Sequence, residues 1–354
     1  MELKEYRFDE VTINFDKKRI PLSGAQRKKR QGNFRYYGAQ GVIDHIDDFI
    51  FDGTYLLIAE DGENLKSKKQ NIAQVVEGQF WVNNHAHIVQ GNELCNTRYL
   101  CYLLNSMDLS GYVTGSAQPK LSQANLNAVT LFLPSITVQE RIVESLYLFD
   151  KKIAVNQKIN DNLQQQAQAI YASMFVDNAE PTWKQGHLSD FVIVRYGKDH
   201  KKLADGIYPV YGSGGIMRHV ERPLYDKESV LIPRKGTLNN VMYVNQPFWS
   251  VDTMFYTEMR QPNVAKFVYH FVKAKDLASM NAGSAVPSMT TDILNAMEIV
   301  IPPASVLEEF ESLVAPMYRA MQENDAQSKK LADLRNALLP KLMSGEIDVS
   351  DIQL

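Results

Sequence analysis

The sequence predicts an α+β protein made of two similar α/β domains, each followed by a long helix. Two patterns indicate this fold. Apolar residues recur at alternating spacings of four and three residues in two long stretches. Short motifs of the first half of the chain also return in the second half at a nearly constant offset, which is the mark of an internal repeat.

The first long stretch runs from about Thr137 to Phe175. Eight of its ten repeating positions are apolar, and charged or glutamine residues fill the faces between them. A heptad pattern kept for this length predicts a helix that packs against another helix along a seam. At 1.5 Å per residue the helix would span roughly 58 Å. The seam positions are Ile142, Leu146, Phe149, Ile153, Asn156, Asn160, Leu163, Ala167, Ile170 and Met174.

Its partner is a second heptad stretch, 168 residues further along the chain. This seam is also apolar, with one exception at Arg335, and its polar positions Asn324 and Ser328 match Asn156 and Asn160. Polar seam residues fix the register of paired helices, so these four are expected to lie together. The second seam consists of Phe310, Val314, Met317, Met321, Asn324, Ser328, Leu331, Arg335, Leu338 and Leu342.

The repeated motifs define the domains. Tyr37–Val42 returns as Tyr211–Ile216 at an offset of 174, and Phe80-Trp81 returns as Phe248-Trp249 at an offset of 168. Gly115-Ser116-Ala117 matches 283–285, a further instance at offset 168. We therefore predict a first domain over residues 1–135, a helix over 136–177, a second domain over 178–303, and a second helix with a tail over 304–354.

Within the domains, β-branched and aromatic runs between turn residues predict strands, and apolar periodicity predicts one helix in each copy. Pro316 is expected to kink or interrupt the second long helix and Pro340 to break it near its end, because proline lacks the amide hydrogen. The expected strands are Tyr55–Ala59, Gln79–Val82, His85–Val89, Val129–Leu133, Ser229–Pro233, Met254–Thr257 and Glu298–Ile301, and the expected helices are Thr97–Met107 and Asn263–Leu277.

Composition excludes several classes. The chain has 354 residues, 45% of them hydrophobic, and a net charge of −3, so a nucleic-acid partner would have to be met by local patches. It has no phosphate-loop motif, no G-x-S-x-G, no H-E-x-x-H and no Asn/Asp-Pro-Pro-aromatic tetrapeptide. We expect no catalytic residues and no metal site, with His85 and His87 merely sharing one face of a strand. Two cysteines, a charged N-terminus and no membrane-length apolar run predict a cytoplasmic protein.

Basic groups occupy corresponding places in the two copies, just before the repeated Tyr-Gly motif. A charge run is usually a solvated surface, but a matched pair of runs favours contacts with phosphates. Loops after matched strands carry opposite charge, Glu60-Asp61 in the first copy and Arg234-Lys235 in the second, so they could read different bases. The candidate DNA-binding residues are Arg27, Lys28, Lys29, Arg30, Arg35, Gln118, Lys120, Lys198, Lys201, Lys202, Arg218, Arg234, Lys235 and Ser288.

Several motifs resemble one known family, the specificity subunits of type I restriction–modification systems. The resemblance is carried by Leu133-Pro134-Ser135, Gln139-Glu140, the heptad helix after them, and the tail Leu338–Ile347. The doubled Gly-Ser-Ala-x-Pro and Phe-Trp motifs resemble the family's two target-recognition domains. One departure is Leu307, which stands where the first copy has Gln139.

The resemblance implies a non-catalytic subunit whose two target-recognition domains each read one half of a bipartite, asymmetric double-stranded DNA target. It implies that the long helices form an antiparallel coiled coil related by a pseudo-two-fold axis, space the domains, and dock two methyltransferase subunits. Those partners would carry S-adenosylmethionine and adenine-N6 methylation, and a motor–nuclease subunit would carry ATP and Mg²⁺. The alternatives are a coiled-coil protein–protein scaffold with no DNA role and a solitary methyltransferase with degenerate motifs; DNA binding separates the scaffold from a specificity subunit.

Overall fold

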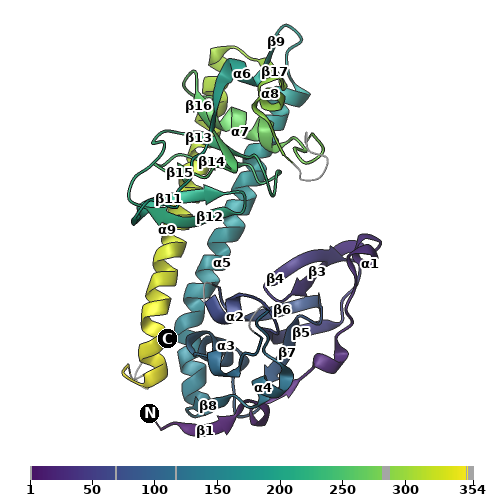
Figure 1. The fold of residues 1–354 in the computed structure, drawn as a ribbon, viewed down its shortest axis with the longest axis vertical. Helices are drawn as coiled ribbons and strands as arrows, with labels where there is room; N and C mark the ends of the chain where they lie inside the picture. The colour runs from purple at the N-terminus through teal and green to yellow at the C-terminus, as the bar shows by residue number, and fades with distance from the viewer. Residues whose placement is uncertain (1, 68–69, 116–117, 281–287, 348, 350–354) are drawn as a thin grey trace. The chain divides into compact units, whose positions relative to one another are not determined.

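The computed structural model describes residues 2–67, 70–115, 118–280, 288–347 and 349. It contains two compact units, of which the first comprises Met1–Val155 and Gln327–Leu354 and the second Asn156–Ala326. Each unit joins one mixed α/β domain to a stretch of both long helices (Figure 1). Two α/β domains with two long helices confirm the predicted fold class. In the described part of the chain, none of the helices has both the length and the apolar character needed to cross a bilayer.

The first unit contains a six-stranded sheet in the order β2-β7-β5-β6-β3-β4, and β1 pairs separately with β8. Helix α3 packs on the sheet, and the predicted strands and helix of this copy are confirmed. The strands are β1 Lys4–Arg7, β2 Thr12–Asn14, β3 Gln31–Gly38, β4 Gly41–Ile46, β5 Phe51–Ala59, β6 Ala73–Val82, β7 Ala86–Gly91 and β8 Thr130–Leu133. The helices of this domain are α1 Gly24–Lys28, α2 Asn64–Ser67, α3 Thr97–Ser106 and α4 Gln123–Asn127.

The second unit divides its strands into a four-stranded sheet, β10-β16-β13-β14, a three-stranded sheet, β12-β11-β15, and the pair β17-β9. Helix α7 packs against β13 and β14, and its residues 265–272 are buried. The strands are β9 Lys184–His187, β10 Val192–Tyr196, β11 Asp205–Gly212, β12 Gly215–Val220, β13 Ser229–Pro233, β14 Met242–Val244, β15 Trp249–Ser250, β16 Met254–Met259 and β17 Glu298–Ile301. The helices are α6 Leu188–Phe191, α7 Ala265–Lys273 and α8 Thr291–Asn295.

The internal repeat is most visible in one hairpin of each unit. The hairpins β3–β4 and β11–β12 share the same register, closing at Gly38↔Gly41 and Gly212↔Gly215, with irregularities at the same two places. In both units the first strand of the hairpin also pairs in parallel with the strand that carries the repeated tryptophan. The outer strands β4 and β12 end their sheets. Corresponding backbone geometry therefore accompanies the repeated Tyr-Gly motif.

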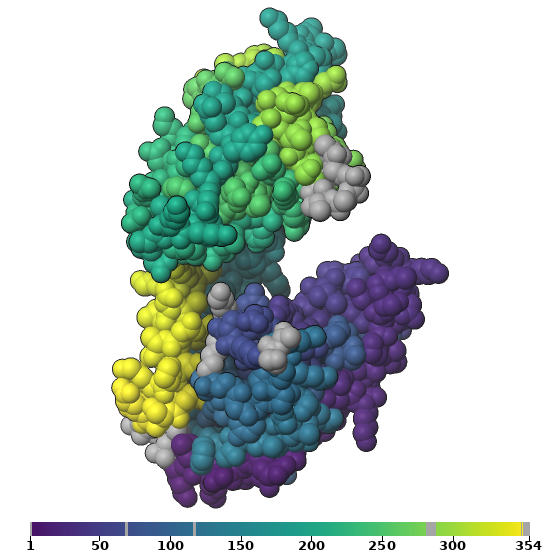
Figure 2. Space-filling view, viewed as in Figure 1, coloured from purple at the N-terminus to yellow at the C-terminus, as the bar shows by residue number. Residues whose placement is uncertain are grey.

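The two long helices are α5, Ile136–Ala172, which continues as a π-helical turn over Ser173–Asp177, and α9, Ala304–Ser344. Every residue of both predicted seams is buried or half-buried, which confirms the heptad prediction. The helices run antiparallel in the second unit, because Asn156 of α5 contacts Asn324 of α9 and Asn160, one turn further along α5, contacts the earlier residue Met321. Figure 2 shows the C-terminal part of α9, in yellow, beside the α/β domain of the first unit, whose core includes Leu342.

The predicted interruption at Pro316 and the predicted break at Pro340 are wrong, since α9 is helical through both residues, and a kink at Pro316 stays a prediction. Each proline removes one backbone hydrogen bond from the helix interior. Pro316 and Pro340 are both exposed, on the side of α9 away from the seam. Buried seam residues on both sides, Val314 and Leu342 among them, hold the helix in place, so packing outweighs the local preference of proline.

Polar seam residues form a connected layer in the second unit. The amide of Asn324 donates to Oδ1 of Asn160 at 2.9 Å, and the amide of Asn160 donates to Asp325 at 2.8 Å. The amide of Asn156 donates to the backbone carbonyl of Asn324 at 3.3 Å. The structure thus brings Asn156, Asn160 and Asn324 together. Ser328 belongs to the first unit, and its position opposite Asn156 stays a prediction.

Each domain is fastened to the helix pair by a polar contact at a corresponding place. In the first unit, Tyr102 of α3 donates to Asp150 of α5, which also accepts from Arg335 of α9. In the second unit, the residues at offset 168 are His270 of α7 and Tyr318 of α9, which contact each other at 3.0 Å. The junction is therefore charged in the first unit. This ion pair with Asp150 explains why Arg335 interrupts the otherwise apolar spacing of the second seam.

The second junction is neutral and buried. His270 Nδ1 lies 2.7 Å from Oε1 of Gln168 in α5, and Nε2 faces the hydroxyl of Tyr318. Burial lowers the pKa of His270 to about 4. An uncharged imidazole can donate one hydrogen bond and accept the other, so both neighbours are satisfied without a buried charge.

We predict that Asn160→Ala lowers the free energy of unfolding by about 1–3 kcal/mol, because it leaves buried polar partners unsatisfied. The double variant Asn160→Leu/Asn324→Leu removes both partners of the bond and is expected to be at least as stable as the single variant. Urea denaturation followed by circular dichroism at 222 nm measures both. If the loss of unfolding free energy in the double variant equals the sum of the losses in the two single asparagine variants, the layer is not coupled.

We also predict an acid-sensitive second unit. The folded-state pKa of His270 is about 4, below the ordinary value of 6.5. The unfolded chain therefore binds a proton first as the pH falls, and the second unit loses about 3 kcal/mol between pH 6.5 and pH 4. Above pH 6.5 this residue contributes no pH dependence. Hydrogen exchange of the α7 amides in the full chain measures the effect, and His270→Gln should flatten it. An unchanged profile in that variant would assign the acid sensitivity to other groups.

Candidate nucleic-acid interface

In the second unit several loops meet at the turn of the β11–β12 hairpin. The amide of Asn240 donates to the carbonyl of Ser213 at 2.8 Å. A Cβ added at Gly236 would lie 2.5 Å from Oγ of Ser213, so this loop also touches the turn. A hollow of about 430 Å³ opens there and is lined by His200, Gly212, Ser213, Gly214, Met217, Val251, Asp252 and Thr253.

Predicted DNA-binding residues surround this hollow. Lys198, Lys201 and Lys202 are exposed on the loop that carries His200. The backbone amides of Arg234 and Lys235 both donate to the carbonyl of Thr253, at 2.9 and 3.2 Å. The lining includes one carboxylate, Asp252, and Asp199 lies next to His200 in sequence, so cations outnumber acids on these loops. Such a surface attracts phosphates.

Of two further candidates, Ser288 lies near this turn and Arg218 makes its contacts away from it. Ser288 pairs with Lys235 in an antiparallel bridge, which places it beside the hollow. Arg218 lies further along β12, where its guanidinium donates to Asp205 at 2.9 Å and to the carbonyl of Leu203 at 2.8 Å. Arg218 therefore ties the two strands of the hairpin together at the end away from the turn. The guanidinium of Arg234 is half-buried over the ring of Tyr196, with 5.4 Å to its centroid.

The corresponding turn of the first unit, Ala39-Gln40, carries less positive charge. A Cβ added at Gly62 would lie 3.1 Å from Nε2 of Gln40, so the loop after β5 touches this turn as Gly236 touches Ser213. Lys120 pairs with Asp61 in an antiparallel bridge, at the place that Ser288 occupies beside Lys235. Gln118 is exposed in the same loop. Two predicted residues of the first copy, Gln118 and Lys120, thus lie near the turn.

The acidic loop of the first unit is bound within its own domain. Glu60 accepts from Arg19 at 3.1 Å and pairs with Lys120 at 3.3 Å, and its side chain is only 15% exposed. Asp61 pairs with His85 at 2.7 Å. The structure therefore gives Glu60 the role of holding the loop, whereas Lys235 of the second copy is exposed.

The basic run Arg27–Arg30 begins on α1 and ends two residues after it, at the end of the hairpin away from the turn. Arg27 pairs with Asp44 and Arg30 with Asp47, each at 2.9 Å. In the described part of the chain no ion-pair partner is found for the exposed Lys28 and Lys29. Arg35 of β3 donates to the carbonyl of Glu77 at 2.7 Å. Lys28 and Lys29 are thus the most available cations of this group.

The two basic groups nevertheless occupy the same segment of the repeat. The indole of Trp81 donates to the carbonyl of Ile20 at 2.6 Å, and that of Trp249 donates to Lys198 at 2.8 Å. In the first unit, Arg30 lies ten residues after Ile20, and its carbonyl accepts from Asp47 just after β4. In the second unit, Ala204 lies six residues after Lys198, and its carbonyl accepts from Glu221 just after β12. The longer segment of the first unit contains α1, which carries Arg27 and Lys28. Both tryptophans are buried, as expected for core anchors.

Among the described residues, no three His, Cys, Asp or Glu side chains lie close enough together to hold a metal ion. His87 is buried, with Nδ1 2.6 Å from Asp16 and Nε2 2.8 Å from the carbonyl of Leu121. Burial alone would raise the pKa of Asp16, but hydrogen bonds from His87 and an amide outweigh it and keep that pKa below its usual value. Burial raises the pKa of Cys95 to about 12, which suits an unreactive core residue.

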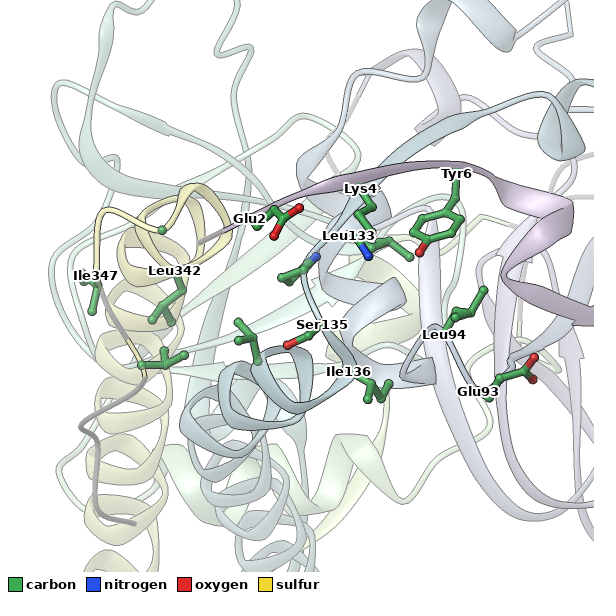
Figure 3. Close-up of a pocket in the computed structure, with 14 residues that line it drawn as sticks. Glu2, Lys4, Tyr6, Glu93, Leu94, Leu133, Ser135, Ile136, Leu342 and Ile347 are labelled. Atoms are coloured by element: carbon green, nitrogen blue, oxygen red, sulfur yellow. The ribbon is translucent and has the colours of Figure 1, made fainter.

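A separate cavity of about 540 Å³ lies in the first unit, between β1, the start of α5 and the end of α9 (Figure 3). Glu2, Lys4 and Glu93 supply its charged lining, and Leu342 and Ile347 come from the C-terminal segment. Nearby, Gln139 is fully buried and bonds the amide of Asn96 and the carbonyls of Leu94 and Pro134. These contacts tie the first turn of α5 to the domain, a structural role.

Comparison with known proteins decides the family. The sequence pattern of the type I restriction modification DNA specificity domain matches residues 2–165 and 180–309, most of the chain. The chain belongs to this family. The two matched segments correspond to the two copies of the internal repeat, so each specificity domain carries one of the turns described above.

Relatives of this chain agree with that assignment. A putative type I restriction enzyme specificity subunit of Haemophilus influenzae is 26% identical over 94% of this chain and 93% of its own length. A type I restriction enzyme specificity subunit of Methanocaldococcus jannaschii is 25% identical over 72% of this chain and 70% of its own. The crystal structure of a type I restriction–modification S subunit from M. genitalium has a similar fold, with a TM-score of 0.58, 14% identity, and coverage of 97% and 96%.

We predict that Lys201→Gln/Lys202→Gln reduces the salt dependence of DNA binding by about two counterions, with a slope change of about 0.9 for each phosphate that is no longer neutralised. Affinity for random duplex should fall at low salt and converge with wild type at high salt, because only the electrostatic contribution is removed. Fluorescence anisotropy over a salt series measures the slope. The matched control is Lys227→Gln/Lys273→Gln, two exposed lysines of the same unit that lie outside the loop that carries His200. An equal slope change in the control pair would contradict a local phosphate contact.

Proposed function

We propose that this chain is the non-catalytic DNA-recognition subunit of a type I restriction–modification complex. Each specificity domain would read one half of a bipartite, asymmetric double-stranded target, using the loops around its hairpin turn. The observation that carries the proposal is the repeated hairpin turn, framed by loops that bear most of the exposed cations predicted from the sequence. Family membership supports the same role.

Partner subunits would supply all chemistry. We propose that two methyltransferase subunits dock on the long helices and bring S-adenosylmethionine for adenine-N6 methylation, and that a motor–nuclease subunit brings ATP and Mg²⁺, all acting on cytoplasmic DNA. Exposed apolar residues on the helices, Leu148 and Leu313 among them, suit such docking because they are not part of the seam. The repeated architecture supports two equivalent docking positions.

The proposal is tested by sequencing the methylated bases of a host that expresses this chain with its methyltransferase partner. A two-part motif that disappears when the chain is omitted is the expected result. A gel-shift assay with random duplex at low and moderate salt complements it. No binding in either condition would favour the protein–protein scaffold.

The helix pair is expected to act as a ruler between the two half-sites. Asn160 faces Asn324, so an insertion after Leu163 in α5 is matched by one after Ala320 in α9. Seven residues in each helix, continuing both seams, would add about 10 Å. The unread spacer of the target should then lengthen by about three base pairs at 3.4 Å each, while both half-site sequences stay the same.

Methylome sequencing of the double-insertion variant beside wild type measures the spacer. The single insertion in α5 is the control, because it moves Gln168 away from His270 and disrupts the second junction. It should abolish methylation. An active double-insertion complex with an unaltered spacer would show that the helices serve for docking alone.

A further inference from the structure

Each hairpin presents a pair of exposed aliphatic side chains directly after its turn. Val42 and Ile43 are 43% and 51% exposed, and Ile216 and Met217 are 55% and 62% exposed. The two pairs occupy the same positions of β4 and β12, and the sequence of buried and exposed residues along these two strands is identical. Neither pair belongs to any of the apolar cores.

Both pairs lie on strands that end their sheets. Exposed apolar residues on an edge strand promote unwanted association, and proteins usually protect such edges with charged residues. The hairpin instead holds one member of each pair in a set position. A Cβ added at Gly38 would lie 3.1 Å from Cγ2 of Ile43, and one at Gly212 would lie 2.6 Å from Sδ of Met217. Ile43 and Met217 therefore pack against the backbone of Gly38 and Gly212, where no side chain intervenes, and this contact fixes their position.

Cationic and polar loops surround these apolar pairs. Met217 lines the hollow together with His200, on the loop of Lys201 and Lys202. Gly62 approaches Gln40 at the turn before Val42, and the loop of Lys120 bridges Asp61. An apolar centre with a basic rim is complementary to a DNA groove, where phosphates form the edges and thymine methyl groups lie on the floor.

We propose that the β3–β4 and β11–β12 hairpins enter the major groove and that Ile43 and Met217 contact thymine 5-methyl groups, one in each half of the target. A two-stranded β-ribbon fits the major groove, and the thymine methyl is the one apolar group that base edges present there. The inference rests on the proposed DNA-recognition function and adds the residues and the chemical group that they read.

The test uses the full chain assembled with its methyltransferase subunits and duplexes that carry the wild-type methylated motif. Each thymine of the motif is replaced singly by deoxyuridine, which removes only the methyl group. Wild type should lose affinity about fourfold at one thymine in each half-site, the effect of one buried methyl group. Met217→Gln should abolish the loss in one half-site only, and Ile43→Thr, which keeps one methyl group, should reduce it in the other half-site only.

Ile207→Thr is the matched control, because Ile207 is 79% exposed on the same hairpin but near its far end. It should leave both deoxyuridine effects intact. Thermal unfolding and assembly with the partner subunits establish that each variant is folded. If Met217→Gln or Ile43→Thr loses a partner subunit while the deoxyuridine effects are unchanged, the exposed aliphatic side chains contact that subunit and the inference is overturned.

Unchanged deoxyuridine effects in both Met217→Gln and Ile43→Thr, or none in wild type, would likewise overturn it. In either case selective binding of the motif by wild type would leave the proposed function standing. A wild-type complex that does not distinguish the motif from random duplex would instead contradict the proposed function itself.

Discussion

The packing of α5 against α9 is the constraint on which the rest of the structure depends. Helix residues belong to the domain cores themselves. Ile142, Leu146 and Leu342 lie in the core of the first unit, and Phe310 and Val314 lie in that of the second. Neither domain can bury its apolar surface without the helices, and the helices cannot bury their seam without each other. Domain folding and helix pairing are therefore coupled. The polar layer around Asn160 sets the register of α5 against α9 in the second unit.

The internal repeat preserves the positions of the residues that join domain to helix more strictly than their chemical type. At the domain–helix junctions a charged set, Tyr102, Asp150 and Arg335, corresponds to a neutral set that includes His270 and Tyr318. Both arrangements satisfy every polar group that the contact buries, which is the physical requirement at such a site. Two different solutions at one position allow each domain to keep its place on the helices while its sequence diverges.

The same contrast holds at the candidate interface. Backbone register, glycine positions and the buried tryptophan are common to both hairpins, so the turn is presented in the same way in each domain. The charges differ: the second turn is framed by exposed lysines, whereas Glu60 of the first is held by Arg19 and Lys120. A shared frame with different loop chemistry suits two domains that read different sequences.

The sequence by itself determined the domain–helix–domain–helix plan, the paired seams and the positions of seven of the 17 described strands, because periodicity and repeated motifs are local signals. It also placed Lys198, Lys201, Lys202, Arg234 and Lys235 in one group of candidates, which the fold then gathered at one turn. Tertiary structure alone decided which cations are free. Arg27, Arg30 and Arg218 are held by carboxylates on or directly after a strand of the nearby hairpin, contacts that depend on strand register and not on sequence proximity.

Tertiary packing also overrode the local preference of Pro316 and Pro340, and it gave Arg335 a partner in Asp150 that no motif predicted. The exposed pairs beside Gly38 and Gly212 emerged in the same way, since exposure depends on what the remaining chain covers. Local patterns fix which element forms. The balance of burial and charge across elements far apart in the chain fixes what each element presents to a partner.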